Sequence, residues 1–257
     1  MGLILAFVVG LILGILGGGG SILTLPILVY FFDVQPILAT SYSLFIVGIS
    51  ALIATQRFIV KKQVSYKIGI WFAIPSLIGV YFSRQWILPN IPNSIFTIGD
   101  FALSKDIFLL CFFAIIMLLA GLSMIFVKRT KLKPINTINY FGVIIDGLVV
   151  GVVTGLVGAG GGFLIVPALV LLAGLDIRKA IGTSLMIIAL KSIIGFLGDT
   201  SLEKDWVLLL SFTLISSIGI LVGIFFAKYI EGKNLKSIFG VFVILMSLFI
   251  LVKELFL

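Results

Sequence analysis

Long apolar stretches separated by short polar ones make up most of the chain. Runs without a charged residue cover 1–32, 34–56, 107–127 and 206–227, and about 20 apolar residues are enough to cross a bilayer. We therefore predict eight apolar segments that are helical and lie in a membrane. Their approximate bounds are residues 2–32, 36–56, 68–88, 107–127, 138–173, 180–198, 206–227 and 237–252.

The first and fifth of these segments are longer than one span requires, and both contain clustered glycines. Residues 10–29 align without gaps on 151–170, a shift of 141 residues, and nine of the twenty aligned positions are identical. The identities include a proline and five glycines, so we infer an internal duplication. The chain then divides into a first repeat (1–127), a basic cytoplasmic linker (128–137) and a second repeat (138–257) of one membrane domain.

The glycine runs at 17–20 and 158–162 interrupt the helical pattern. Each glycine inside a helix costs about 1 kcal/mol relative to alanine. The glycines therefore either break the helix or allow another helix to approach closely. We expect close packing at the isolated Gly10 and Gly14 and a true break at the two runs. A break in the membrane core has to face protein or a water-filled cavity, because its freed backbone groups need partners.

The distribution of lysine and arginine tests what these breaks do to the topology. If every segment crosses once, the two faces carry ten and seven basic residues. If the two broken segments are re-entrant hairpins, 13 of the 18 basic residues share one face, which the positive-inside rule favours. The N-terminus and the loops near 34, 95 and 202 are then outside, and the loops near 62, 131, 177 and 233 are inside.

The predicted fold is therefore an all-α polytopic membrane protein built from two inverted repeats. Each repeat has one glycine-broken re-entrant hairpin and three transmembrane helices, because a hairpin plus three spans gives an odd number of crossings. Inverted repeats with broken helices are an architecture of secondary transporters.

Composition excludes several classes of protein. With 61% hydrophobic and 11% charged residues, the chain is too apolar for a soluble domain, in which about 25% of residues are charged. It has no histidine and one cysteine, and it has no glycine-rich nucleotide motif, so we expect no enzyme, no metal site and no cofactor. The net charge of +8 lies mainly in short loops, which predicts contact with lipid rather than nucleic acid, in an inner or plasma membrane.

Each hairpin would expose the N-terminus of its second half-helix near the membrane midplane. Such an end has unsatisfied N–H groups and about half a positive charge, and glycine lets a ligand approach the backbone. Two such ends brought together by the inversion would bind a small anion. The predicted substrate-binding residues are Gly17, Gly18, Gly19, Gly20, Ser21, Gly158, Gly160, Gly161, Gly162, Lys191, Thr183, Ser184 and Ser43.

Several of these residues have a second interpretation. Lys191 lies inside a predicted span, where a lysine costs roughly 2.5–3.5 kcal/mol, and it either faces the substrate path or extends to the outer interface. Ser21 either caps its helix or binds the ligand. The other hydroxyls either donate to the anion or bond to carbonyls of their own helix. Asp146 either pairs with Lys191 or lies at the cytoplasmic interface, which the hairpin arrangement favours.

At these positions the chain resembles the TauE/SafE family of sulfite-exporter-like membrane permeases. The resemblance rests on the doubled G-x-x-x-G-x-x-G-x-G-G…P segment at Gly10 to Pro26 and Gly151 to Pro167, and on A-x-G-T-S at Ala180 to Ser184. The first-half counterpart of the latter reads A-T-S-Y-S and departs from that form. The resemblance covers nearly the whole chain, and it implies transport of a sulfur-containing anion such as sulfite, a sulfonate, sulfoacetate or thiosulfate.

The sequence leaves two functions open. One is a secondary transporter, a permease or exporter, of small anions, and the other is a passive anion channel in which the two hairpins line a pore. An intramembrane enzyme is not supported, because the chain has neither histidine nor an intramembrane carboxylate pair. A homodimer also stays open, with Gly69 and Gly79 as candidate positions for packing between two copies.

Overall fold

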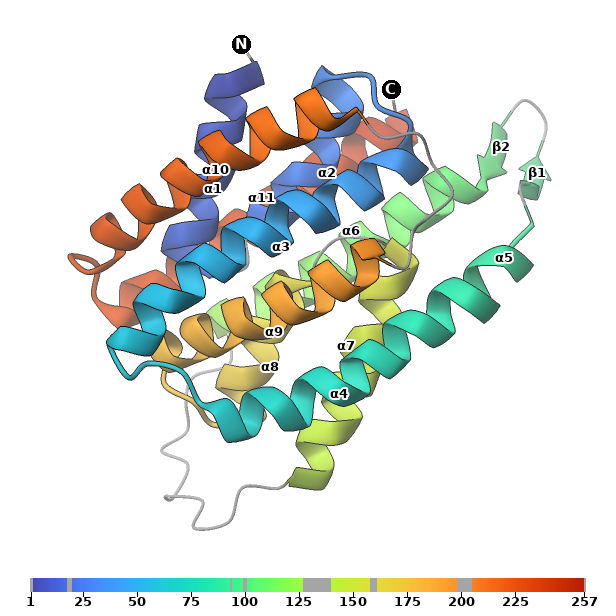
Figure 1. The fold of residues 1–257 in the computed structure, drawn as a ribbon. Helices are drawn as coiled ribbons and strands as arrows, with labels where there is room; N and C mark the ends of the chain where they lie inside the picture. Colours follow the sequence, from blue (N-terminus) through green and yellow to red (C-terminus); the bar gives the residue numbers. More distant parts are fainter. Residues whose placement is uncertain are drawn as a thin grey trace.

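The fold comes from a computed structural model that describes residues 2–17, 20–92, 94–98, 101–126, 140–157, 161–197 and 205–256 (Figure 1). The predicted linker at 128–137 lies outside the described residues. The first half contains α1 (Gly2–Leu16), α2 (Gly20–Phe31), α3 (Pro36–Val60), α4 (Tyr66–Phe82), the π-helical segment η1 (Ser83–Ile87), α5 (Leu88–Asn90), β1 (Ser94–Ile98), β2 (Phe101–Ser104) and α6 (Lys105–Phe126). The second half contains α7 (Tyr140–Val157), α8 (Gly162–Leu171), α9 (Ile177–Leu197), α10 (Trp206–Ala227) and α11 (Gly232–Phe256).

Six helical stretches are long and apolar enough to cross a membrane, among the residues that the structure describes. They are Leu38–Val60, Tyr66–Asn90, Ile107–Phe126, Ile177–Leu197, Trp206–Ala227 and Ser237–Glu254. Each corresponds to one of the predicted apolar segments, so six of those segments are continuous helices. The prediction of a helical, multi-pass membrane protein is confirmed.

One short sheet was missed by the all-α prediction. Strands β1 and β2 form an antiparallel hairpin in which Thr97 pairs with Ala102 and Ile98 with Phe101. The hairpin lies between the end of α5 and the start of α6, outside any predicted span. Its first strand reads Ser-Ile-Phe-Thr-Ile, and β-branched and aromatic residues favour the extended backbone of a strand.

The first and fifth predicted segments are each divided into two helices at their glycines. Helix α1 ends at Leu16 and is followed by Gly17 with a φ of 71°, while Gly161 has a φ of 74° directly before α8. These positive values lie in the left-handed region that glycine adopts without steric cost. In Figure 1 the start of α1 and the end of α2 lie near the same edge of the molecule, and α7 starts at the opposite edge.

Helices α9 and α3 lie at the centre of the bundle, and α6 and α11 lie at its periphery. The spanning windows of α9 and α3 are 67% and 56% buried, whereas those of α6 and α11 are each 28% buried. The two central helices pack on each other, and so do the two peripheral ones. The peripheral pair therefore presents most of its apolar surface to lipid.

Close backbone contacts through glycine join α1 to α10. A Cβ atom at Gly10 would lie 1.9 Å from the carbonyl oxygen of Ser216, and one at Gly219 would lie 2.3 Å from that of Phe7. Small residues let membrane helices approach in this way, and the close approach increases van der Waals contact. The expectation that Gly10 serves close packing is confirmed.

The same arrangement recurs between α7 and α4. A Cβ atom at Gly151 would lie 2.3 Å from the carbonyl oxygen of Ser76, and one at Gly79 would lie 2.5 Å from that of Leu148. Relative to the α1 and α10 contact, the α7 positions are shifted by 141 residues and the α4 positions by 140. The two halves of the chain thus exchange equivalent helix contacts.

The two glycines proposed for a homodimer are used within the chain. Gly79 packs on α7, and a Cβ atom at Gly69 would lie 2.2 Å from the Cε atom of Met186 on α9. Both glycines are buried. The idea that they pack between two copies is therefore wrong, because the chain itself already covers them.

Replacing Gly151 by alanine should destabilise the protein. The new methyl group would meet the Ser76 backbone, which cannot move like a flexible side chain, and overpacking costs about 1–3 kcal/mol. We expect Gly151→Ala to lower the thermal unfolding midpoint of the detergent-purified protein. The matched control is Gly195→Ala, whose Cβ would meet only the Cδ1 atom of Leu44 at 3.3 Å. Equal midpoints for the two variants would contradict the packing argument.

Candidate functional site

Lys191 lies in the interior of the bundle. Its side chain is 2% exposed, and it lies on α9, six residues before the end of that helix at Leu197. The side chain is therefore enclosed by protein rather than extended to the outer interface. An enclosed ammonium group loses its hydration and needs polar or anionic partners.

The ammonium group of Lys191 is hydrogen-bonded to helix α7. Its Nζ donates to the Oγ1 atom of Thr154 at 2.7 Å, and that hydroxyl lies 3.2 Å from the carbonyl oxygen of Gly151. Lysine has three N–H donors. Among the described residues this is the one hydrogen bond that Nζ makes, and no carboxylate there forms an ion pair with it.

The second helix break lies directly against this ammonium group. Gly161 precedes α8, and its carbonyl oxygen accepts hydrogen bonds from Leu164 and Ile165 at 3.0 Å. A Cβ atom at Gly161 would lie 2.7 Å from the Nζ of Lys191 and 2.3 Å from the Cγ2 of Thr154. The start of α8, with its free N–H groups and partial positive charge, thus lies beside a lysine side chain.

Further buried hydroxyl groups lie on the helices that surround Lys191. Ser76 and Ser83 lie at the α4 and η1 interface with α7, and Ser192 follows Lys191 on α9. All three are buried, and their hydroxyls have no hydrogen-bond partner among the described residues. Buried hydroxyls without partners are uncommon, so this region has hydrogen-bonding capacity that the chain itself does not use.

The first helix break is held by a different part of α9. The Ser184 hydroxyl lies 2.7 Å from the carbonyl oxygen of Gly17 and 2.8 Å from that of Ile181, and its single proton serves these two acceptors. The side chain of Ile181 fills the space next to Gly17. Ser184 therefore satisfies a carbonyl at the end of α1, which is a supporting role.

Thr183 also has a supporting contact. Its Oγ1 accepts a hydrogen bond at 2.9 Å from the backbone N–H of Ser65, the residue that precedes α4. The contact ties the start of α4 to α9. Neither Thr183 nor Ser184 is directed to the surroundings of Lys191, since Ser184 and Lys191 are seven residues, or about 10 Å, apart along α9.

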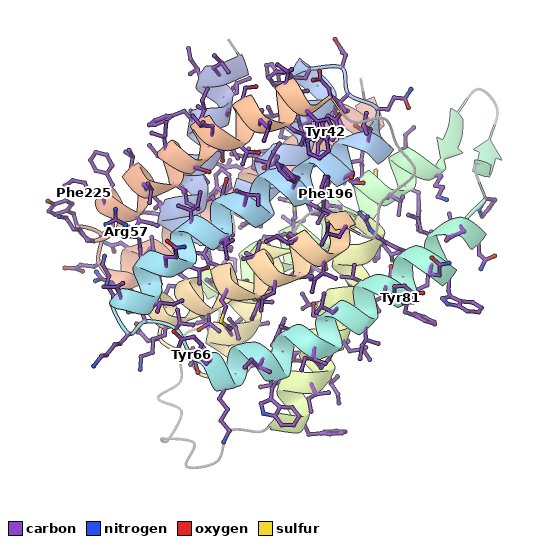
Figure 2. All side chains as sticks on the ribbon, in the orientation of Figure 1. Tyr42, Arg57, Tyr66, Tyr81, Phe196 and Phe225 are labelled. Atoms are coloured by element: carbon purple, nitrogen blue, oxygen red, sulfur yellow. The ribbon has the colours of Figure 1, made fainter. Side chains whose placement is uncertain are left out.

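Ser43 is a buried hydroxyl on α3 without a hydrogen-bond partner among the described residues. Tyr42 beside it accepts a hydrogen bond at 2.5 Å from the backbone N–H of Asp205, and Figure 2 shows it near the start of α10. The carboxylate of Asp205 in turn accepts from Val207 and Leu208 at 3.0 Å. Tyr42 thus joins the starts of α3 and α10, and Ser43 keeps an unused hydroxyl.

Asp146 does not pair with Lys191. It lies on α7, eight residues before Thr154, which is about 12 Å along the helix. Since the ammonium group of Lys191 lies at Thr154, the alternative in which the two charges form an ion pair does not hold.

Of the residues predicted for the site, the structure brings Lys191 and Gly161 together, with Gly162 as the first residue of α8. Gly17, Thr183 and Ser184 gather at the first break instead. Gly20 begins α2, and the side chain of Ser21 lies outside the described part of the structure. Gly18, Gly19, Gly158 and Gly160 lie outside the described residues as well.

Two residues near Lys191 were missed by the sequence-based prediction. Thr154 occupies the position that Leu13 has in the first copy of the repeat, so a polar residue replacing an apolar one was a visible signal. Arg84 lies inside the third predicted apolar segment and was counted there only as a topological charge. Its electrostatic interaction with Lys191 is repulsive.

Six spanning helices, two interrupted helices and a buried lysine beside one interruption are features of a membrane transporter. The chain belongs to the sulfite exporter TauE/SafE family, whose family model matches residues 2–254. The resemblance read from the doubled glycine motif is confirmed.

Curated relatives cover almost the whole chain. A "probable membrane transporter protein" of Methanocaldococcus jannaschii is 28% identical over 97% of this chain and 94% of its own length. The "probable membrane transporter protein YunE" of Bacillus subtilis is 29% identical over 96% of both chains. No solved structure matches. The protein is a multi-pass membrane transporter of the TauE/SafE family.

Removing the Ser184 hydroxyl should weaken the fold more than the transport site. In Ser184→Ala the carbonyl of Gly17 loses its partner, and a buried polar group without a partner costs about 1–3 kcal/mol. We expect a lower unfolding midpoint with unchanged substrate affinity. The matched control is Ser192→Ala, also buried on α9, whose hydroxyl has no described partner and whose loss leaves the midpoint nearly unchanged. A wild-type midpoint for Ser184→Ala would disprove the supporting role.

Proposed function

We propose that this transporter is a secondary transporter of small anions, and that its substrate is sulfite, an organosulfonate or another sulfur oxyanion. The observation that carries the proposal is the enclosed ammonium group of Lys191, placed against the start of α8 with one hydroxyl as its described hydrogen-bond partner. The sulfur chemistry rests on the family, whose description names a sulfite exporter.

The physical argument is one of charge balance. A buried ammonium group in a region of low dielectric is costly without an opposite charge, and the start of a helix adds partial positive charge at the same place. A bound oxyanion supplies negative charge, and it accepts hydrogen bonds from Nζ and from the first N–H groups of α8. Among described residues, no carboxylate does this for Lys191.

We propose Lys191, Gly161 and Gly162 as the centre of the site, with Ser43 as a further hydroxyl. Gly17, Gly20, Thr183 and Ser184 then shape and support the first break, and Ser21 begins its second helix. Gly18, Gly19, Gly158 and Gly160 stay predicted as positions where a ligand approaches the backbone. This division differs from a symmetric site, because the two breaks contact α9 at levels about 10 Å apart.

We further propose that the two interrupted segments are re-entrant hairpins and that residues 1–127 and 138–257 are inverted repeats. Three observations support this arrangement. The glycine contacts of α1 with α10 recur between α7 and α4, the two broken segments start at opposite edges of the molecule (Figure 1), and 13 of the 18 basic residues would then share one face. Inverted repeats of this type support alternating access in secondary transporters.

Cysteine labelling at two exposed loop positions separates the two topologies. Asp33 and Asp176 are exposed and follow the first and second broken segments. If both segments are hairpins, Asp33→Cys and Asp176→Cys lie on opposite faces; if every segment crosses once, they share a face. In a Cys111→Ser background, we expect an impermeant maleimide to label only Asp33→Cys in intact cells and both variants after lysis. Labelling of both from outside would refute the inversion.

Removing the Lys191 charge should weaken anion binding. A charge-assisted hydrogen bond is worth about 1.5–3 kcal/mol, so Lys191→Met should raise the dissociation constant of the best ligand about ten- to hundred-fold. The ligand is chosen by thermal shift from sulfite, sulfate, thiosulfate, taurine and sulfoacetate. Residual binding should persist because the N-terminus of α8 remains. The control is Lys179→Met, which removes an exposed charge from the start of α9.

An unchanged dissociation constant in Lys191→Met would remove Lys191 from the site. Flux into proteoliposomes tests the mode of transport with the same anion. A secondary transporter gives saturable flux that is coupled to an ion gradient, whereas ohmic single-channel currents would identify the passive anion channel instead.

A further inference from the structure

A second cation lies near Lys191 and is not used by the site proposed so far. Arg84 is in η1, the five-residue π-helical segment that continues α4. The π-helical turns of proteins are rare and occur frequently at functional sites. The side chain of Arg84 is partly buried, and its Nε atom is fully buried. An arginine enclosed within a spanning helix is costly, so its retention there calls for a physical reason.

Arg84 and Lys191 lie at matching depths. The helical stretch that contains Arg84 runs from Tyr66 to Asn90, so Arg84 is six residues from its end. Lys191 is likewise six residues from the end of α9. At 1.5 Å per residue, each lies about 9 Å from the end of its helix. Helices α4 and α9 pack on each other and run in the same direction in Figure 1, so the two positions face the same membrane level.

The helix between them links both residues to one place. η1 packs on α7, and a Cβ atom at Gly155 would lie 2.9 Å from the Cβ of Ser83, the neighbour of Arg84. The next residue toward the N-terminus of α7 is Thr154, which accepts the hydrogen bond of Lys191. The fully buried hydroxyl of Ser83 has no described partner.

Two positive charges that repel each other need compensation. The interaction between Arg84 and Lys191 is repulsive, and the start of α8 adds further partial positive charge beside Lys191. One negative charge from a bound ligand would leave this region with a net positive charge. Two negative charges would neutralise both side chains.

The charges belong to one half of the chain alone. The positions that correspond to Lys191, Thr154 and Arg84 in the other half are Ser50, Leu13 and Ile224, by the shifts of 141 and 140 residues. Ser50 contacts the hydroxyl of Ser216 at 3.4 Å, and the other two residues are apolar. The repeat therefore has one charged location and one neutral counterpart.

We propose that Arg84 and Lys191 together form a single binding site for a doubly charged tetrahedral oxyanion, located beside the start of α8. The site selects dianions such as sulfate, sulfite and thiosulfate over singly charged sulfonates. Arg84 is the residue that sets this selectivity, and Ser83 is placed to donate a hydrogen bond to the anion. The inference rests on the proposed anion transport and names the charge of its substrate.

Sulfate and methanesulfonate test the selectivity. They share a tetrahedral sulfur and differ in one oxygen and one unit of charge. We expect the wild-type protein to bind sulfate at least about ten-fold more tightly, because the second charge gains a charge-assisted contact. Arg84→Gln should raise the sulfate dissociation constant about ten- to hundred-fold while changing that of methanesulfonate less than about three-fold, so the preference collapses. Arg84→Lys should keep part of it, because the charge remains without the planar fork.

The control is Arg57→Gln, which removes an exposed arginine near the end of α3 and should leave both constants unchanged. Gel filtration and the unfolding midpoint verify that each variant is folded, and Arg84→Lys replaces Arg84→Gln if the latter is not. Equal losses for both anions, or an unchanged sulfate preference, would overturn the role of Arg84 while leaving anion transport intact. If the wild type binds neither anion nor sulfite, thiosulfate, taurine or sulfoacetate, both this inference and the proposed function fail.

Discussion

An interrupted helix in a hydrocarbon environment persists only where protein supplies partners for its freed backbone groups. Helix α9 meets this requirement for both interruptions. Ser184 satisfies the carbonyl of Gly17 at the first break, and Lys191 lies against Gly161 at the second. This explains why α9 is the most enclosed of the spanning helices and why it is rich in buried polar residues.

The glycine contacts make this cover possible. Because α1 lies against α10 and α7 against α4 at distances that exclude a Cβ atom, the interrupted helices are held without long side chains between them. The same closeness leaves little room for water around Lys191. A positive charge that could have been a neutral residue is thereby placed where hydration is poor, next to a helix start with the same sign of charge. A ligand of opposite sign is the simplest way to make that arrangement favourable.

The sequence predicted the features that depend on local composition. Charge-free runs located the six spanning helices, and the glycine runs located both interruptions, because these signals act within a few residues. The hairpin of β1 and β2 was missed because a short segment outside the apolar runs gives only a weak pattern. The partners of Ser184 and Lys191 could not be predicted, since they lie 167 and 37 residues away along the chain. Thr154 was recognisable only as a departure from the repeat.

The central claim is that an anion occupies the space between the start of α8 and Lys191. A crystal structure of the protein with selenate tests it directly, because selenium locates a tetrahedral dianion by anomalous scattering. The account predicts one strong peak within hydrogen-bonding distance of Lys191 and of the first N–H groups of α8, lost in Lys191→Met. A selenate peak at another position, with none beside Lys191, would contradict it.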